Sequence, residues 1–318
     1  MLDAGCSMSE NSLSDLNTVP PGHRSGFVAV IGRPNVGKST LMNQFLGQKV
    51  AIVSPKPQTT RTRIRGILTR EAFQVIFVDT PGLHRPLHKL GEVMVAAVAS
   101  AIPDADVVLF LVDVSVMPRE EDRMIARMVR ERTQNPVILV LNKMDRLPAD
   151  RIQRHTEAYW GLLPDHAGWM MTIATEAVNL DKLLEMIVEH LPEGPRYYPG
   201  DQVTDQTERE IAAELVREQV LRFTREEVPH AVAVVVEEFK ERENNVVYIA
   251  ANIYVERDSQ KGILIGRGGR MLRRIGAAAR QEIERMVGGR VYLDLWVKVS
   301  KNWRRDPRRV RRMGYTPE

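Results

Sequence analysis

Five short, almost continuously apolar runs alternate with segments of helical character between Gly26 and His190. The runs read FVAVIG, FQVIFVD, DVVLFLVDV, PVILVLN and WMMTIA. A strand that is apolar nearly throughout must be covered on both faces, as in a parallel sheet between two layers of helices. The first half of the chain is therefore predicted to be a three-layer α/β domain. The helices expected after the strands span residues 38–47, 89–101, 120–132, 149–160 and 180–190.

A different plan begins after residues 191–206, a segment with three prolines, two glycines and no apolar periodicity. This composition indicates a linker. Beyond it, a helix, two strands, a glycine loop, a helix and a strand predict an α+β domain with a small sheet. We therefore expect four parts: a disordered leader, an α/β domain, a linker and a second domain with a basic tail, at residues 1–24, 25–190, 191–206 and 207–318.

The net charge of +4 is unevenly distributed. From Arg257 to Glu318 there are 17 Lys and Arg against 6 Asp and Glu, a net of +11, so the remaining residues carry −7. This distribution favours a polyanion bound at one end, with a solvated basic tail as the alternative. Cys6 is the single cysteine, and no run approaches the ~20 apolar residues of a membrane span. We expect a cytoplasmic protein.

The sequence GRPNVGKS matches the pattern G-x-x-x-x-G-K-[ST] and lies between a predicted strand and a predicted helix. Its glycines let the backbone wrap a β-phosphate with N–H groups. Lys38 would reach the β- and γ-phosphates, and the Ser39 hydroxyl would bind Mg²⁺. The loop therefore predicts a nucleoside triphosphate site. The contacts expected here are Gly32, Arg33, Pro34, Asn35, Val36, Gly37, Lys38 and Ser39.

Two further motifs follow predicted strand ends. DTPG places Asp79 where it can hold Mg²⁺ and Gly82 where its N–H can sense a γ-phosphate. In NKMD, the Asp145 carboxylate can accept hydrogen bonds from N1–H and the exocyclic amine of guanine, and adenine offers neither donor. Asp145 therefore predicts guanine specificity. The contacts expected from these motifs are Asp79, Thr80, Pro81, Gly82, Leu83, Asn142, Lys143, Met144 and Asp145.

Residues 56–64, KPQTTRTRI, lie where a GTPase needs a mobile segment with a threonine for Mg²⁺. Thr60 is the expected ligand, Thr59 is the alternative, and a solvated β-edge is the competing interpretation. Leu83 cannot orient a water as a glutamine does, so slow intrinsic hydrolysis is expected. Asn35 either coordinates K⁺, which would act like an arginine finger, or serves only to form the loop. The expected catalytic residues are Lys38, Thr60 and Asn35, and the expected metal ligands are Ser39, Thr60 and Asp79.

A second glycine loop, at residues 266–269, has the form G-x-x-G, which clamps the backbone of single-stranded nucleic acid. Alone the pattern is weak, but the order of strands around it and the local charge favour this interpretation. Trp303 either stacks on a base or packs on the sheet. The expected RNA contacts are Gly266, Arg267, Gly268, Gly269, Arg270, Arg273 and Arg274.

Together, GRPNVGKST, PQTTR, DTPG, NKMD, KGILIGRGGRMLRRIG and LWVKVSKNWRRDPRRVRRMGY resemble the Era family of bacterial GTPases from about Gly26 to the C-terminus. The resemblance implies a P-loop GTPase domain followed by a type II KH domain. It implies GTP hydrolysis to GDP with Mg²⁺, and a role in assembly of the small ribosomal subunit. The KH domain would bind near the 3′ end of the small-subunit ribosomal RNA. Peripheral contact with the inner membrane is also implied, and no obligate oligomer is expected.

The segment TIATEAVN departs from the family pattern, which has a Ser-Ala pair. Ile173 stands in the serine position and Ala174 is retained, so the Ala174 N–H is expected to meet guanine O6 with weaker support. Ala177 stands where glycine is common. Two rival functions are a GTP-regulated membrane-surface protein, which would not need a G-x-x-G loop, and an RNA-binding module with a vestigial G domain. The second rival conflicts with the intact Lys38, Ser39, Asp79 and Asp145.

Overall fold

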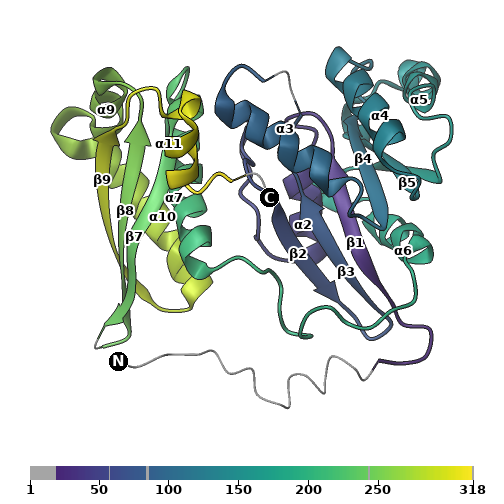
Figure 1. The fold of residues 1–318 in the computed structure, drawn as a ribbon, viewed down its shortest axis with the longest axis horizontal. Coiled ribbons are helices and arrows are strands. Elements are labelled where there is room, and N and C mark those ends of the chain that lie inside the picture. Colours follow the sequence, from purple (N-terminus) through teal and green to yellow (C-terminus); the bar gives the residue numbers. More distant parts are fainter. Residues whose placement is uncertain (1–18, 57, 84–85, 243, 317–318) are drawn as a thin grey trace.

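A computed structural model describes residues 19–56, 58–83, 86–242 and 244–316 and places two domains side by side (Figure 1). Most of the predicted leader, residues 1–18 with Cys6, lies outside the described residues. Its last part was predicted wrongly. His23 is buried with its Nδ1 2.8 Å from the Gly194 carbonyl oxygen, and Arg24 already begins the first strand. The folded chain therefore begins before Gly26.

The first domain contains a six-stranded sheet in the order β2-β3-β1-β4-β5-β6. The five predicted apolar runs form its parallel strands, whereas β2 is an antiparallel edge that the sequence did not indicate. Helices α2 and α6 cover one face, and α3, α4 and α5 cover the other. The strands are β1 (Arg24–Ile31), β2 (Ile64–Thr69), β3 (Phe73–Asp79), β4 (Val107–Asp113), β5 (Val137–Asn142) and β6 (Gly168–Thr172); the helices are α2 (Lys38–Leu46), α3 (Lys89–Ala101), α4 (Glu120–Arg132), α5 (Ile152–Trp160) and α6 (Leu180–His190).

The second domain has a three-stranded sheet, with β7 antiparallel to β8 and β8 parallel to β9. Helices α7 and α10 pack on one face of this sheet. The eight-residue helix α9 was not predicted, because its apolar run is only three residues long and follows Gly262. The elements are α7 (Glu208–Phe223), α8 (Val228–Ala231), β7 (Ala233–Arg242), β8 (Val246–Val255), α9 (Asp258–Ile265), α10 (Arg270–Val287), β9 (Arg290–Val299) and α11 (Pro307–Arg312).

Residues 191–206, predicted as a linker, lie against the first domain. The Ile67 N–H donates to the Val203 carbonyl at 2.8 Å, and the Gln74 Oε1 accepts from two backbone amides of the segment. An ion pair of 2.6 Å joins Arg65 to Asp205. The segment contains no long helix or strand, but these contacts fix its course along β2 and β3. The segment that joins the two domains is therefore an ordered linker packed against the first domain.

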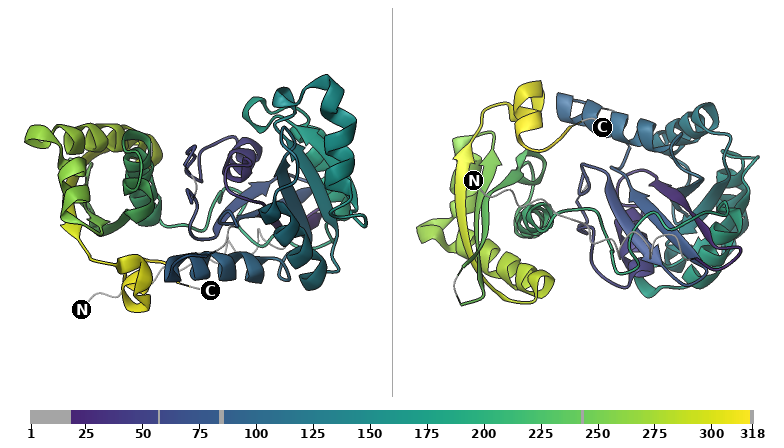
Figure 2. Two further views of the ribbon diagram at one scale, coloured as in Figure 1. Left: turned by 90° about the horizontal axis from the view of Figure 1, so that it is seen from above. Right: turned by 60° about the horizontal axis from the view of Figure 1, so that its bottom comes forward.

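The predicted basic tail is instead folded and packs between the domains. Asp306 caps α11 by accepting from the Arg308 N–H, and Trp303 is fully buried with its Nε1 donating to the Ala231 carbonyl at 2.8 Å. Base stacking by Trp303 was therefore a wrong interpretation, while packing was right. Its cluster joins both domains: Leu90, Val93, Met94, Ala233, Trp303, Val310, Met313 and Tyr315. Both views in Figure 2 show α11 next to α3.

Candidate nucleotide pocket and nucleic-acid groove

A cavity of about 470 Å³ opens at the carboxyl ends of the parallel strands in the first domain. This is where ligands bind in open α/β sheets, and the volume suits a small molecule. Its lining includes ten of the predicted nucleotide contacts: Pro34, Asn35, Gly37, Lys38, Ser39, Gly82, Asn142, Lys143, Asp145 and Ala174. Residues 52–55 and 58–60 form another wall, of which the sequence had singled out only the threonines.

The P-loop backbone depends on glycine at position 37. Its φ of 110° lies in the left-handed region, and a Cβ there would come within 2.4 Å of the Asn142 Nδ2. Lys38 is buried, with its Nζ donating to the carbonyls of Gly32 and Arg33 at 3.2 Å. Burial lowers the pKa of Lys38 to about 8, although the charge of Asp79 opposes the shift. An anion in the loop would therefore stabilise the lysine's charge.

Three oxygen-bearing side chains meet beside the P-loop. The Ser39 Oγ donates to the Asp79 Oδ2 at 2.6 Å, and the Thr60 Oγ1 lies 3.2 Å from the same carboxylate atom and 3.0 Å from the Ser39 Oγ. Burial raises the pKa of Asp79, against the lowering effect of Lys38. The Asp79 Oδ1 is buried without a hydrogen-bond partner among the described residues. Hard oxygen ligands with an unpaired carboxylate atom fit a Mg²⁺ ion.

Thr59 is turned away from this cluster. Its Oγ1 donates to the Lys56 carbonyl at 2.7 Å, whereas Thr60 is 5% exposed and faces Asp79. The geometry therefore favours Thr60 over Thr59 as a metal ligand.

Asn142 links the P-loop to the loop that contains Ala174. Its Nδ2 donates to the Val36 carbonyl at 2.8 Å, and its Oδ1 accepts from the Thr172 Oγ1 and from the Ala174 N–H at 3.0 Å. The Ala174 amide, which we expected to meet guanine O6, is thus already bonded to Asn142. Asp145 lies at the mouth of the cavity with its side chain 37% exposed, 3.6 Å from Arg146. Its carboxylate can therefore accept from a base.

Asp113, at the end of β4, does not line the cavity but holds the lining residue Lys143, and the sequence interpretation missed it. The Lys143 Nζ bridges its Oδ2, at 2.8 Å, and the Asn35 carbonyl, at 2.6 Å. Burial would raise the pKa of Asp113, but hydrogen bonds from Lys143 and Ser115 hold it below its ordinary value. The Arg33 side chain also turns toward Asp113, away from the cavity. An Asp ending an apolar strand, like Asp79, was the available signal.

Two side chains were expected to affect the rate of hydrolysis. Leu83 is buried in the core between the sheet and helices α3, α4 and α5, and its side chain therefore does not reach a water in the cavity. Asn35 has a φ of 63°, and its Nδ2 donates to the Pro55 carbonyl at 2.8 Å. These features agree with its loop-forming role, and the potassium ion beside Asn35 stays a prediction.

A second cavity, of about 450 Å³, lies between α10 and the edge strand β9. Three of the predicted RNA contacts line it, together with six residues that were not predicted as RNA contacts. The spacing of positions 269, 273, 276 and 280 at three and four residues was the available signal, because it places them on one helix face. The lining residues are Gly268, Gly269, Leu272, Arg273, Gly276, Ala277, Arg280, Leu293 and Leu295.

The glycines of the G-x-x-G loop differ in how closely other atoms approach them. A Cβ on Gly266 would lie 2.8 Å from the Met271 Cβ, whereas one on Gly268 or Gly269 would meet nothing within 4 Å. Arg273 donates to the Gly268 carbonyl at 2.6 Å. The Arg274 guanidinium instead lies 4.2 Å over the Phe223 ring on α7, so the structure does not bring it to the groove.

Comparison with known proteins agrees with this division. Residues 27–143 match the family described as 50S ribosome-binding GTPase, and residues 227–304 match the KH domain family. The GTPase Era of Heliobacterium modesticaldum is 48% identical over 92% of this chain and 97% of its own. The chain belongs to the Era GTPase family. The GTPase Era of a Nostoc strain is 51% identical over 94% of this chain and 92% of its own.

Solved Era structures also share the whole fold. Era in complex with MgGDPNP and nucleotides 1506–1542 of 16S ribosomal RNA is 41% identical, with a TM-score of 0.89 over 92% of this chain and 99% of its own. A single-residue variant of Aquifex aeolicus Era bound to GDP·AlF4⁻ is also 41% identical, with a TM-score of 0.88 over the same shares. These likenesses confirm the predicted family, GTPase activity and fold class.

Proposed function

We propose that this Era-family GTPase acts in the cytoplasm in assembly of the small ribosomal subunit. The KH groove holds single-stranded RNA near the 3′ end of the small-subunit ribosomal RNA, with an affinity that depends on the bound nucleotide. Lys38 contacts the phosphates, Ser39, Thr60 and Asp79 hold Mg²⁺, and Asp145 selects guanine. Mg²⁺ would neutralise charge developing on the phosphates during hydrolysis. The Era structure solved with MgGDPNP and a 16S ribosomal RNA segment supports this assignment.

The observation that carries the proposal is a segment shared by both domains. Val53 lines the nucleotide cavity, and its N–H donates to the Glu218 Oε1 on α7 at 3.0 Å. Lys49 reaches the other oxygen of Glu218 at 2.5 Å, and Ile52 is buried in the core cluster of the KH domain. A nucleotide that orders this wall of the cavity therefore also acts on the helix that packs beneath the RNA-binding sheet.

RNA affinity should depend on the nucleotide. We expect a single-stranded RNA matching the small-subunit 3′ end to bind about tenfold more tightly with a GTP analogue than with GDP, a coupling of ~1.4 kcal/mol. Fluorescence anisotropy with labelled RNA measures both affinities. The RNA should raise the affinity for the GTP analogue over GDP by the same factor, because coupling between two sites is reciprocal. Equal RNA affinities in the two states would contradict the proposal.

Nucleotide affinity should fall above pH 8. The Lys38 pKa of about 8 describes the protein without an anion, and bound phosphate raises it, so binding favours the protonated lysine. Affinity should be constant below about pH 7 and about fourfold weaker at pH 8.5, where most Lys38 is neutral before binding. Titration with a fluorescent GDP analogue measures this change. An affinity that stays constant from pH 7 to 8.5 would show that Lys38 keeps its charge without phosphate.

The proposal includes two finer assignments, a potassium ion and a membrane contact. K⁺ beside Asn35 would supply positive charge like an arginine finger, at a site where Leu83 cannot orient the attacking water. Equal hydrolysis rates in potassium and sodium buffers would reject this assignment. Peripheral contact with an anionic membrane is the second candidate partner, because α11 exposes Arg308, Arg309, Arg311 and Arg312. Within the described residues, no helix has the length and apolar character needed to cross a bilayer. The groove at the G-x-x-G loop favours RNA, and sedimentation with anionic vesicles tests the lipid.

A further inference from the structure

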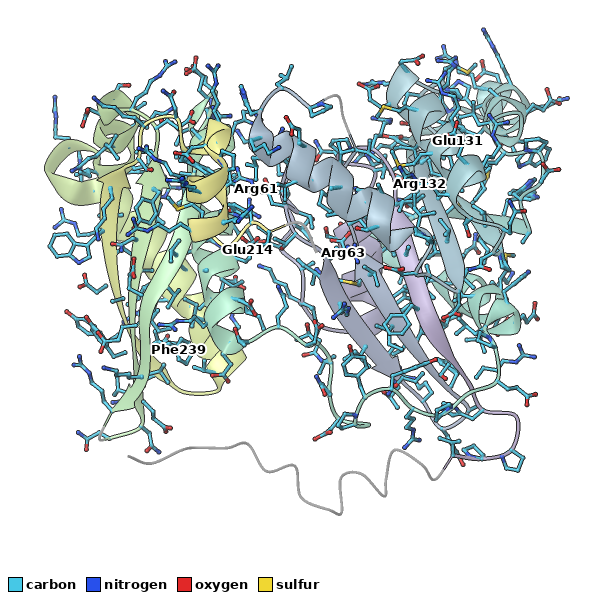
Figure 3. The ribbon with its side chains drawn as sticks, viewed as in Figure 1. Arg61, Arg63, Glu131, Arg132, Glu214 and Phe239 are labelled. Atoms are coloured by element: carbon cyan, nitrogen blue, oxygen red, sulfur yellow. The ribbon has the colours of Figure 1, made fainter. Side chains whose placement is uncertain are left out.

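The side chain of Arg61 extends from the first domain into the second. Its neighbour Thr60 points toward Ser39 and Asp79, whereas the Arg61 side chain runs in the opposite direction and is only 2% exposed. Figure 3 shows Arg61 in the space between the two domains, with Glu214 of α7 beside it. Two consecutive residues thus connect the candidate metal site with the KH domain.

The socket that receives Arg61 consists of groups from the KH domain. Its Nη1 donates to the Val232 carbonyl at 2.5 Å and to the Tyr315 Oη at 3.2 Å. Its Nη2 donates to the Pro229 and His230 carbonyls at 3.3 and 3.2 Å. The guanidinium carbon also lies 5.8 and 5.6 Å from the ring centres of Trp303 and Tyr315. A planar fork of donors can satisfy this set, and a lysine ammonium cannot.

The backbone immediately before Thr60 is held by the same domain. The Arg217 Nη2 on α7 donates to the Thr59 carbonyl, and Arg217 is fully buried and paired with Glu214 at 2.5 Å. On the same side, the Lys56 Nζ donates to the Thr224 carbonyl at 3.1 Å. The KH domain therefore holds the residues on both sides of Thr60, while the Thr60 side chain itself faces the first domain.

We infer that Arg61 is a positioning residue for GTP hydrolysis, and that the KH domain provides its socket. With Arg61 seated, Thr60 lies at the candidate Mg²⁺ site; with Arg61 withdrawn, a charged group must leave four acceptors and two rings, so intermediate positions are disfavoured. The socket, formed by residues 229–232 together with Trp303 and Tyr315, thereby controls a metal ligand in the other domain. The inference rests on the proposed role of Thr60 as that ligand.

Replacing Arg61 with alanine tests this assignment. We expect Arg61→Ala to lower kcat for GTP about 10- to 100-fold and to raise the Mg²⁺ concentration needed for half-maximal hydrolysis by about tenfold, as loss of a group that orients a metal ligand does. Affinity for GDP should change less than about twofold, because the phosphate and base contacts stay in place. A merely structural loss would weaken GDP binding along with hydrolysis, which would overturn the inference.

Arg63→Ala is the matched control. Arg63 is an equally long side chain two residues away, but its Nε donates to the Ala97 carbonyl at 3.0 Å and its Nη2 to the Ser100 Oγ, both on α3 of the first domain. Its loss should leave the Mg²⁺ requirement unchanged. An increase as large as that of Arg61→Ala would show that the effect is not specific to the socket.

The socket side supplies a second, milder test. Tyr315→Phe removes one acceptor and should reduce kcat about three- to tenfold. Because both changes act through one contact, the double variant should be no slower than Arg61→Ala alone. If the loss of kcat in the double variant equalled the product of the two single losses, the inference would be wrong. If circular dichroism shows that Arg61→Ala does not fold, Arg61→Lys and Tyr315→Phe replace it in the test. Arg61→Lys is then expected to retain only part of the wild-type rate.

Thr60→Ala separates this inference from the proposed function. It should reduce kcat and raise the Mg²⁺ requirement at least as much as Arg61→Ala. If only Thr60→Ala has these effects, the socket role is wrong and the proposed metal site stands. If Thr60→Ala leaves hydrolysis unchanged, the proposed metal ligand is wrong and the inference fails with it.

Discussion

Asp145→Asn should lower the affinity for GTP by about 100-fold or more and convert the pocket toward xanthosine triphosphate. The Asp145 carboxylate can accept from guanine N1–H and from the 2-amine. An asparagine places a donor N–H opposite the 2-position, where guanine has an amine and xanthine has a carbonyl oxygen. The variant therefore loses an acceptor for guanine and gains a donor for xanthine. Competition of GTP and xanthosine triphosphate against a labelled nucleotide measures both changes.

Asp150→Asn provides the matched control for this exchange. Asp150 is exposed on the short helical turn Ala149–Arg151 and does not line the nucleotide cavity, so the same chemical change should leave both affinities within about twofold. If Asp145→Asn kept its preference for GTP over xanthosine triphosphate, the assignment of Asp145 as the base-selecting residue would be wrong.

Gly268→Asp should weaken RNA binding by about 100-fold or more, because it places a carboxylate where the phosphate backbone approaches and like charges repel by several kcal/mol. Folding should tolerate the change. Gly268 has a φ of 59°, a conformation that aspartate adopts more readily than most residues, and a Cβ there meets nothing within 4 Å. Anisotropy with the labelled 3′-end RNA measures the loss, and nucleotide affinity should be unchanged.

Gly268→Asn separates charge from bulk in this experiment. Asparagine has nearly the same size as aspartate and also tolerates a positive φ, but it is neutral. We therefore expect Gly268→Asn to retain most of the affinity that Gly268→Asp loses. Equal losses would show that side-chain volume at the loop matters and charge repulsion does not. Loss of nucleotide binding in either variant would contradict the separation of the two sites.

Local patterns predicted most of the elements and both glycine loops. The apolar runs predicted β1 and β3–β6, because a strand buried on both faces needs apolar residues at nearly every position. They did not predict the edge strand β2, whose short apolar pattern Arg65 and Gly66 interrupt. They also did not predict helix α9, which contains only three consecutive apolar residues. The glycine loops could be predicted from the sequence because positions such as Gly37 and Gly266 have no room for a side chain and therefore require glycine.

By itself, the sequence determined which chemical groups stand beside each candidate phosphate-binding loop. In the first loop, the spacing of lysine, hydroxyl and carboxylate matches the geometry of a triphosphate with its metal ion. The tertiary structure alone decided the partners of groups whose role depends on distant segments. Trp303, Tyr315 and Arg61 lie up to 254 positions apart and meet in one buried cluster. No local periodicity records such a contact, because burial of a charge depends on how the two domains pack together.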